Sequence, residues 1–199
     1  MPKKFTILVG KSASGKTTLA DYMVKHGYKK YRTTTTRPIR ENETKYDYNF
    51  ISENKFLNYL DKGKFIEYNT YNVVFDGKQQ TWYYGTPIKN MLFDFSKYVI
   101  VLTLDGAIEF VNYYGKENCD IVYIDCSDDI RQQRAKTRGS YQEDEWFRRM
   151  RADELDFDKE KVIVNCNIVV NSEGKTLKKI LTEVEHGRNA WTDTFNQFR

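Results

Sequence analysis

One stretch near the N-terminus reads Phe5-Thr6-Ile7-Leu8-Val9-Gly10-Lys11-Ser12-Ala13-Ser14-Gly15-Lys16-Thr17. Its first five residues are apolar or β-branched and end at a glycine, which is typical of a buried strand. Apolar residues at helical spacing follow at Leu19, Tyr22 and Met23, before a His26-Gly27 stop signal. The stretch therefore predicts a strand, a loop and a helix in close succession.

The loop over residues 10–17 fits the pattern G-x-x-x-x-G-K-[ST]. Its small residues let consecutive backbone N–H groups curl around a diphosphate, and the following helix N-terminus adds positive potential. The alternative is a chance glycine-rich turn, but the lysine, the threonine and the strand-to-helix context all favour phosphate binding. We predict a nucleoside triphosphate site in which Lys16 reaches the terminal phosphates and Thr17 offers a hydroxyl to Mg²⁺. The expected binding residues are Gly10, Lys11, Ser12, Ala13, Ser14, Gly15, Lys16, Thr17 and Thr18.

Length and composition indicate one ordered domain. The 199 residues include 40% hydrophobic and 30% charged side chains, enough to build a core and a polar surface. No apolar run approaches the ~20 residues that a spanning helix needs. The net charge of +4 is compatible with small anionic ligands as much as with nucleic acid. Composition alone therefore excludes membrane spans but assigns no ligand.

The cysteines and the N-terminal residues favour a cytoplasmic protein. Cys119, Cys126 and Cys166 are odd in number and lack the spacing of a metal site, so we expect reduced thiols. The apolar run over residues 5–9 is too short for a signal peptide.

The rest of the chain alternates strand and helix signals, with two interruptions. Apolar runs at 98–104, 121–124 and 168–170 predict buried strands, each followed by a candidate helix, and this alternation predicts a parallel α/β sheet. Residues 31–86 alternate polar and apolar side chains and predict an inserted, partly antiparallel β region. Residues 134–151 are highly charged and predict a lid or a solvated helix. A terminal stretch carries Trp191, Phe195 and Phe198 at helical spacing, which favours docking onto the core, with a dimer contact as the alternative.

Phosphate-seeking side chains continue beyond the loop. Arg37 and Arg40 lie three residues apart and could converge on one phosphate through paired hydrogen bonds, although two arginines in a loop are more often simply solvated. The ordered motifs around them resemble those of the guanylate kinase family over about residues 5–185. These motifs are Thr35-Thr36-Arg37-x-x-Arg40, Glu43, Asp47-Tyr48-x-Phe50, Phe65-Ile66-Glu67-Tyr68, Tyr84-Gly85-Thr86, Arg134-x-x-x-Arg138-Gly139, Arg149 and Val162-Ile163-Val164-Asn165.

The resemblance implies an acceptor site for a nucleoside monophosphate. Its phosphate would be held by Arg37, Arg40, Tyr48 and Tyr84. Glu67 would accept hydrogen bonds from N1–H and the exocyclic amine of guanine, with Thr34 and Thr86 at the remaining base edge. Adenine offers no such donors and would leave a buried Glu67 unpaired, which is costly. Taken alone, without the surrounding motifs, Glu67 is better read as an exposed strand residue that alternates with Phe65 and Tyr68.

The resemblance further implies that Arg134, Arg138 and Arg149, together with Lys16, neutralise the transferring phosphoryl group, and that Asn165 contributes to ATP binding. Such transfer depends mainly on positioning and charge. The structural alternative is that these arginines pair with nearby acids on a solvated helix. The nearby acids are Glu143, Asp144, Glu145 and Asp153.

Two departures from the family pattern bear on selectivity. Val101 and Thr103 stand where the family has acidic residues, and Asp105 stands where it has glutamine. Asp105 at the predicted strand end, or Asp125 at the end of the next strand, is a candidate to replace the missing charge near the metal. The hairpin over residues 71–82 is longer than the family's, which could shift selectivity toward a deoxynucleotide or a modified guanine.

The expected fold is a P-loop NTPase-type α/β domain over residues 1–199, with the inserted monophosphate-binding region and a helical lid. Its core would span about 1–30, 87–133 and 159–187, its acceptor-binding insertion about 31–86, its lid about 134–158 and a C-terminal appendage 188–199. The expected function is Mg²⁺-dependent phosphoryl transfer from ATP to GMP or dGMP, by a monomer or homodimer without nucleic acid or membrane partners. The alternatives are a kinase for another nucleoside monophosphate and a catalytically silent protein-binding module.

Overall fold

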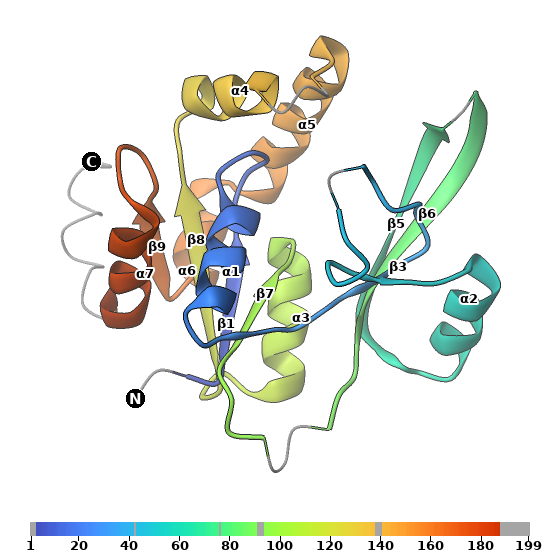
Figure 1. Ribbon diagram of the computed structural model, residues 1–199, viewed down its shortest axis with the longest axis horizontal. Coiled ribbons are helices and arrows are strands. Elements are labelled where there is room, and N and C mark those ends of the chain that lie inside the picture. Colours follow the sequence, from blue (N-terminus) through green and yellow to red (C-terminus); the bar gives the residue numbers. More distant parts are fainter. Residues whose placement is uncertain (1–2, 42, 76, 91–93, 138–140, 188–199) are drawn as a thin grey trace. The chain divides into compact units, whose positions relative to one another are not determined.

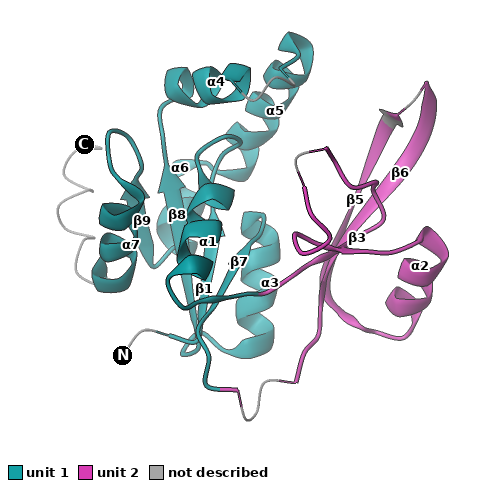
Figure 2. Ribbon diagram, viewed as in Figure 1, with its two compact units in different colours: residues 1–30, 95–199 teal, residues 31–94 magenta. Residues whose placement is uncertain are grey.

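The chain folds into two compact units in a computed structural model that describes residues 3–41, 43–75, 77–90, 94–137 and 141–187 (Figure 1). The larger, here called the core unit, comprises residues 1–30 and 95–199, and the smaller, here called the inserted unit, comprises residues 31–94 (Figure 2). Each unit contains one sheet, and the strands of each sheet pair only within their own unit.

The sheet of the core unit is parallel throughout, as the strand and helix alternation predicts. Its order is β2 (Lys29–Lys30), β7 (Tyr98–Val101), β1 (Phe5–Val9), β8 (Cys119–Asp125) and β9 (Ile168–Asn171). At the centre, Ile7 of β1 lies opposite Ile100 of β7 and Ile121 of β8. Parallel strands need helical crossovers, which cover both faces and explain the continuous apolar runs.

The helices of the core unit cover both faces of this sheet. They are α1 (Lys16–Lys25), α3 (Leu104–Tyr114), α4 (Asp128–Thr137), α5 (Glu143–Asp156), α6 (Lys159–Asn165) and α7 (Leu177–His186). Leu8 of β1 packs in a buried cluster with Leu19 of α1 and Val184 of α7. Phe5 packs against Phe110 of α3, with ring centroids 5.1 Å apart. Successive strand residues alternate between faces, so β1 joins both layers.

The strand predicted over residues 98–104 is shorter than expected. β7 ends at Val101, and α3 begins at Leu104. The cause is Thr103, whose side-chain oxygen accepts a hydrogen bond from the N–H of Gly106 at 3.1 Å and caps the helix. Asp105 therefore lies in the first turn of α3 and not at a strand end.

The inserted unit is mostly antiparallel, as its alternating pattern predicts. Its sheet order is β4 (Asn49–Phe50), β3 (Thr34–Thr35), β6 (Lys78–Pro87) and β5 (Phe65–Phe75). β6 pairs antiparallel with both β5 and β3, whereas β4 pairs parallel with β3. This pairing brings residues from both ends of the insertion onto one small sheet.

One helix of the inserted unit, α2 (Glu53–Asp61), was not predicted from the sequence. Ser52 begins it, because its hydroxyl accepts a hydrogen bond from the N–H of Lys55 at 3.4 Å. Phe56 of α2 is fully buried and stacks on Phe65 of β5, with ring centroids 4.5 Å apart. The helix thus supplies the apolar core that closes one face of the small sheet.

Two further predictions concern the charged stretch 134–151 and the aromatic stripe near the C-terminus. Within the charged stretch 134–151, residues 134–137 end α4 and residues 143–151 form the first part of α5. The stripe of Trp191, Phe195 and Phe198 lies outside the described residues. Among the residues that the structure describes, no helix is long and apolar enough to cross a bilayer.

Candidate active site

The predicted phosphate loop joins β1 to α1 in the core unit, and its backbone bends through three residues of positive φ. These are Gly10 at 144°, Ala13 at 61° and Gly15 at 104°. A Cβ on Gly10 would lie 2.6 Å from the carbonyl oxygen of Ile124, so only glycine fits there. Such alternating backbone conformations turn successive N–H groups toward a common centre, which suits an anion.

Lys16 and the start of α1 give this loop its positive charge. The Lys16 ammonium donates to the carbonyl of Gly10 at 2.6 Å and to that of Lys11 at 2.8 Å. Gly15 caps α1 without a side-chain hydrogen bond, and the first turn holds no acidic residue. The first N–H groups of α1 therefore remain suited to a phosphate, and the ammonium adds positive charge beside them. Thr17 and Thr18 lie exposed in the same turn.

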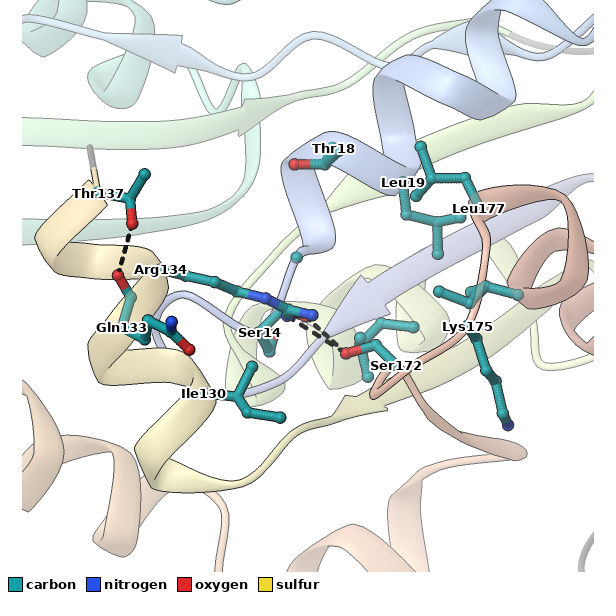
Figure 3. Close-up of a pocket in the computed structure, with 13 residues that line it drawn as sticks. Ser14, Thr18, Leu19, Ile130, Gln133, Arg134, Thr137, Ser172, Lys175 and Leu177 are labelled. Carbon is teal, nitrogen blue, oxygen red and sulfur yellow. Dashed lines mark hydrogen bonds between the residues drawn. The ribbon is translucent and has the colours of Figure 1, made fainter.

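Arg134 binds the loop from α4. Its Nη1 donates to the carbonyl of Ser14 at 3.0 Å, with the sulfur of Cys126 and the hydroxyl of Ser172 each at 3.4 Å. Ser172 also donates to the carbonyl of Ser14 at 3.1 Å. Figure 3 shows this arginine reaching from α4 to Ser172 at the end of β9. Arg134 is thus the predicted catalytic arginine that the fold brings to the phosphate loop.

A pocket of about 500 Å³ lies beside the loop, where α1, α4 and the turn from β9 to α7 meet (Figure 3). Its wall is mixed, because α1 and α4 each contribute both polar and apolar side chains, α7 contributes apolar ones and the turn polar ones. The lining residues are Ser14, Gly15, Thr18, Leu19, Ile124, Ile130, Gln133, Arg134, Thr137, Ser172, Lys175, Leu177 and Ile180. A pocket of this size and mixed character can hold a nucleobase next to loop-bound phosphates.

Asn165 does not line this pocket. It ends helix α6, where its amide donates to the carbonyl of Lys161 at 2.8 Å. The same residue pattern recurs in Ile168-Val169-Val170-Asn171, which forms β9 and leads directly into Ser172 of the pocket wall. Two similar short apolar runs so close together cannot be assigned to strand or helix by pattern alone.

Of the other two predicted lid arginines, Arg149 makes its described contacts within its own helix and not to the loop. Arg149 lies on α5, where its Nε donates to Glu145 at 2.8 Å, and Arg148 binds the same carboxylate at 2.6 and 2.9 Å. These hydrogen bonds lower the pKa of Glu145 to about 2, and the hydrogen bonding from Arg148 has the largest effect. Arg138 lies outside the described residues. The pairing of Arg149 matches the structural alternative, an acid four residues away on the same helix.

The two carboxylates predicted as metal ligands belong to different elements of the core unit. Asp105 is exposed on α3, and Asp125 ends β8, where burial raises its pKa against the opposing hydrogen bond from the N–H of Cys126. No three His, Cys, Asp or Glu side chains within the described ranges gather as a metal site. Mg²⁺ is often held by one or two protein oxygens together with substrate phosphates, so the exposed hydroxyl-bearing Thr17 is compatible with it.

In the inserted unit, Arg37 is held by a carboxylate and aromatic rings. Arg37 is buried and donates to both oxygens of Glu43, at 2.6 and 2.5 Å. Its guanidinium lies 4.9 Å from the ring centre of Tyr48. Burial acts to raise the pKa of Glu43, but hydrogen bonds from Arg37 and from the N–H of Arg40 outweigh it, so the pKa lies below its usual value. Glu43 therefore stays charged and fixes the first arginine.

Tyr84 completes this group. Its ring centroid lies 6.4 Å from that of Tyr48. Burial raises the pKa of the Tyr84 phenol, while the positive charges of Arg37 and Arg40 act in the opposite direction, as expected for nearby guanidinium groups. The four predicted phosphate-binding residues thus come together, although Tyr84 is far from the other three in the sequence.

Glu67 lies opposite Thr86 in the β5–β6 hairpin. The Thr86 hydroxyl donates to Glu67 Oε1, and the amide of Asn69 donates to Oε2 at 3.1 Å. Thr34 is buried on the neighbouring strand, opposite Gly85. Because successive strand residues alternate between faces, Thr34 shares a face with Gly85 and not with Glu67 and Thr86. Of the three predicted base-reading residues, the structure therefore brings Glu67 and Thr86 together, and it adds Asn69, which sequence reasoning missed. Its only signal was its position two residues after Glu67, on the same strand face.

Known proteins resemble the chain in sequence and in fold. The model of the guanylate kinase family matches residues 2–185. Guanylate kinases of Helicobacter pylori strains ATCC 700392 / 26695 and J99 / ATCC 700824 are 29% identical over 140 residues, 67% of this chain. The chain spans 64% of the length of these curated relatives. A crystal structure of guanylate kinase from Anaplasma phagocytophilum has a TM-score of 0.63 at 21% identity, covering 94% of this chain and 86% of that one. The chain belongs to the guanylate kinase family.

Proposed function

We propose that the protein transfers a phosphoryl group from ATP to a nucleoside monophosphate, with GMP or dGMP as the acceptor and GDP or dGDP as the product. The observation that carries the proposal is the curled phosphate loop, with the Lys16 ammonium held at its carbonyls and an uncapped helix N-terminus behind it. A module kept only for binding proteins has no need of this arrangement. Membership of the guanylate kinase family supports the same conclusion.

The donor ATP would bind with its phosphates on the loop and its base in the adjoining pocket. Leu19 and Ile180 offer the base an apolar surface, and Gln133 offers polar groups. Arg134 would act at the phosphates, because it already contacts the loop at Ser14. The roles of Arg138, Arg149 and Asn165 stay predictions from the family resemblance.

The acceptor would bind in the inserted unit. Its phosphate would lie at Arg37, Arg40, Tyr48 and Tyr84, where positive charge and phenol hydroxyls gather. Glu67 would read guanine, because Thr86 and Asn69 orient its carboxylate and each oxygen can accept more than one hydrogen bond. Thr34 and Thr86 would meet the remaining base edge.

Mg²⁺ belongs to the proposal as the ion that offsets charge on the triphosphate oxygens. Thr17 would offer it a hydroxyl, with Asp105 or Asp125 as a candidate carboxylate. Asp105→Asn and Asp125→Asn, each tested by Mg²⁺ titration of the reaction, check the carboxylate role. Unchanged kinetics in both variants would contradict it.

The proposal includes one domain over residues 1–199, with the insertion at about 31–86 and the lid at about 134–158, in a cytoplasmic monomer or homodimer. The three cysteines are buried and free, which is compatible with reduced thiols. Gel filtration with light scattering measures the number of chains per particle.

The test is a coupled assay with ATP and Mg²⁺ and seven acceptors at matched concentrations, namely GMP, dGMP, AMP, dAMP, CMP, UMP and dTMP. We expect diphosphate formation with the guanine acceptors alone, and none in the Lys16→Ala variant, because transfer lacks its cation there. Activity with another base would keep the kinase and overturn its substrate. Silence with all seven, despite ATP binding, would favour a protein-binding module.

A second variant tests how the base is read. Glu67→Gln replaces one carboxylate oxygen by an amide N–H₂, so one of the two hydrogen bonds to guanine is replaced by a repulsive contact between two donors. We expect kcat/KM for GMP to fall by about tenfold to a hundredfold, with the KM for ATP unchanged. An unaltered kcat/KM for GMP would remove Glu67 from base recognition.

A further inference from the structure

Ser12 is the third residue of the phosphate loop, and side chains from two helices bind its backbone N–H and its backbone carbonyl. Its N–H donates to Asp153 Oδ2 at 2.8 Å, and its hydroxyl donates to Asp153 Oδ1 at 3.2 Å. Its carbonyl accepts from Arg131 Nη1 at 2.9 Å. An aspartate of α5 and an arginine of α4 thus hold this single residue.

Arg131 and Asp153 also bind each other in the protein interior. Arg131 Nη1 lies 3.0 Å from Asp153 Oδ2, and the two side chains are 1% and 11% exposed. The second Arg131 nitrogen donates to Asp128 at 2.5 Å, and the guanidinium lies 5.6 Å from the ring centre of Trp146. Taking two charges out of water is costly, and apolar side chains of similar volume often join helices as stably. Stability alone therefore gives little reason for a charged pair here.

The pair acts on the loop where its backbone enters the left-handed region. Arg131 binds the carbonyl of Ser12, and Arg134, three residues later on the same face of α4, binds that of Ser14. Ala13, between them, has a φ of 61°. The carbonyls of Ser12 and Ser14 are bound by α4 and the Ser12 N–H is bound by α5, so these peptide groups are held from outside the loop.

We propose that the Arg131–Asp153 pair positions the first half of the phosphate loop and couples it to α5, which carries Arg149. This inference rests on the proposed kinase function. Asp153 and Arg149 lie four residues apart and share a face of α5, so the contact to Ser12 also fixes where that face meets the loop. Arg131 and Asp153 are positioning residues, because neither is placed to contact a reacting atom.

Loss of the pair should weaken ATP binding and slow phosphoryl transfer, and it should leave binding of the acceptor nucleotide unchanged. The decisive variant combines Arg131→Met with Asp153→Leu, which replaces the pair by apolar side chains of similar size. We expect a melting temperature near that of the unchanged protein, a raised KM for ATP and a kcat about tenfold to a hundredfold lower. The KM for GMP should stay within about twofold, because the acceptor residues belong to the inserted unit.

Two companion variants keep the test decisive. Asp153→Asn retains the shape of the side chain and removes its charge, and it carries the test if the apolar pair does not fold. Glu154→Gln, at the exposed next residue of α5, is the matched control and should leave every constant unchanged. A KM for ATP and a kcat equal to those of the unchanged protein in a folded paired variant would overturn the positioning role.

Binding measurements separate this inference from the proposed function. If the unchanged protein binds ATP by calorimetry but phosphorylates no acceptor, the kinase proposal fails. The positioning role is then tested by the dissociation constant for ATP, which should rise in the Arg131→Met, Asp153→Leu double variant and in Asp153→Asn. An equal constant in all four proteins would show that the pair is only structural.

Discussion

At the scale of single residues, the phosphate loop depends on one close approach of backbone to backbone. Gly10 has a φ of 144°, and a Cβ there would meet the carbonyl oxygen of Ile124 at 2.6 Å. That carbonyl belongs to β8, where Tyr123 pairs with Val9 of β1 and Ile124 pairs with Val170 of β9, so it cannot withdraw without disturbing the sheet. The absence of a side chain at position 10 is thus what lets the loop start where it does.

We expect Gly10→Ala to abolish measurable ATP binding and to lower the melting temperature, since strain and a clash with backbone act together. Gly27→Ala is the matched control, because Gly27 also has a positive φ, of 97°, but nothing lies within 4 Å of its added Cβ. The control should lose about 1–2 kcal/mol of stability and no ATP affinity. Calorimetry of both variants decides, and equal ATP affinities would contradict the close-approach argument.

At the scale of elements, α5 begins with three acids and then carries arginines that pair back onto them. Glu143, Asp144 and Glu145 occupy its first turn, where negative charge is favourable. Glu145 binds Arg148 and Arg149 at once. Arg149 must therefore be shared between this pairing and any phosphate that it serves.

The ion pairs of Glu145 predict a stability change in acid. Its pKa is about 2 in the folded protein against an ordinary 4.5, so the pairs stabilise the folded state fully above about pH 4.5 and not below about pH 2. We expect the stability difference between the unchanged protein and Glu145→Gln to shrink across this window. Carboxyl NMR should find the midpoint of Glu145 near pH 2, and nearer 4.5 after Arg148→Gln. A titration midpoint of Glu145 near pH 4.5 in the unchanged protein would contradict the prediction.

At the scale of the whole molecule, the two units have separate cores. The core unit buries apolar side chains on both faces of its parallel sheet. In the inserted unit, the ring centroid of Phe56 lies 4.5 Å from that of Phe65 and 5.3 Å from that of Tyr83. Phe56 and Phe65 pack against Gly85 of β6. A Cβ on Gly85 would lie 2.8 Å from Phe65 and 3.0 Å from Phe56. A change here should therefore act on one unit first.

We expect Gly85→Ala to weaken GMP binding by about tenfold or more while ATP affinity stays unchanged. The displaced rings would shift β5 and β6, which carry Glu67 and Thr86. Asn58→Ala on the exposed side of α2 is the control and should alter neither affinity. Separate titrations with ATP and GMP measure both, and a parallel loss of the two affinities would show that the units do not respond separately.

The sequence by itself determined the features that are continuous along the chain. The strand, phosphate loop and helix over residues 5–25 are contiguous, so their pattern was sufficient, and the alternation of apolar runs predicted the parallel sheet. The insertion and its antiparallel character followed from a change of period. The helix α2 was missed although Ser52 caps it, because a single capping residue is a weak signal beside alternating aromatics.

Only the tertiary structure decided which distant residues meet. It placed Arg131 and Asp153 around Ser12, and Ser172 on the carbonyl of Ser14. It also put Asn165 on a helix. The physical reason is that buried polar groups must find partners wherever packing brings them, and packing joins residues far apart in the chain. Local pattern specifies elements, whereas partners are chosen by the fold.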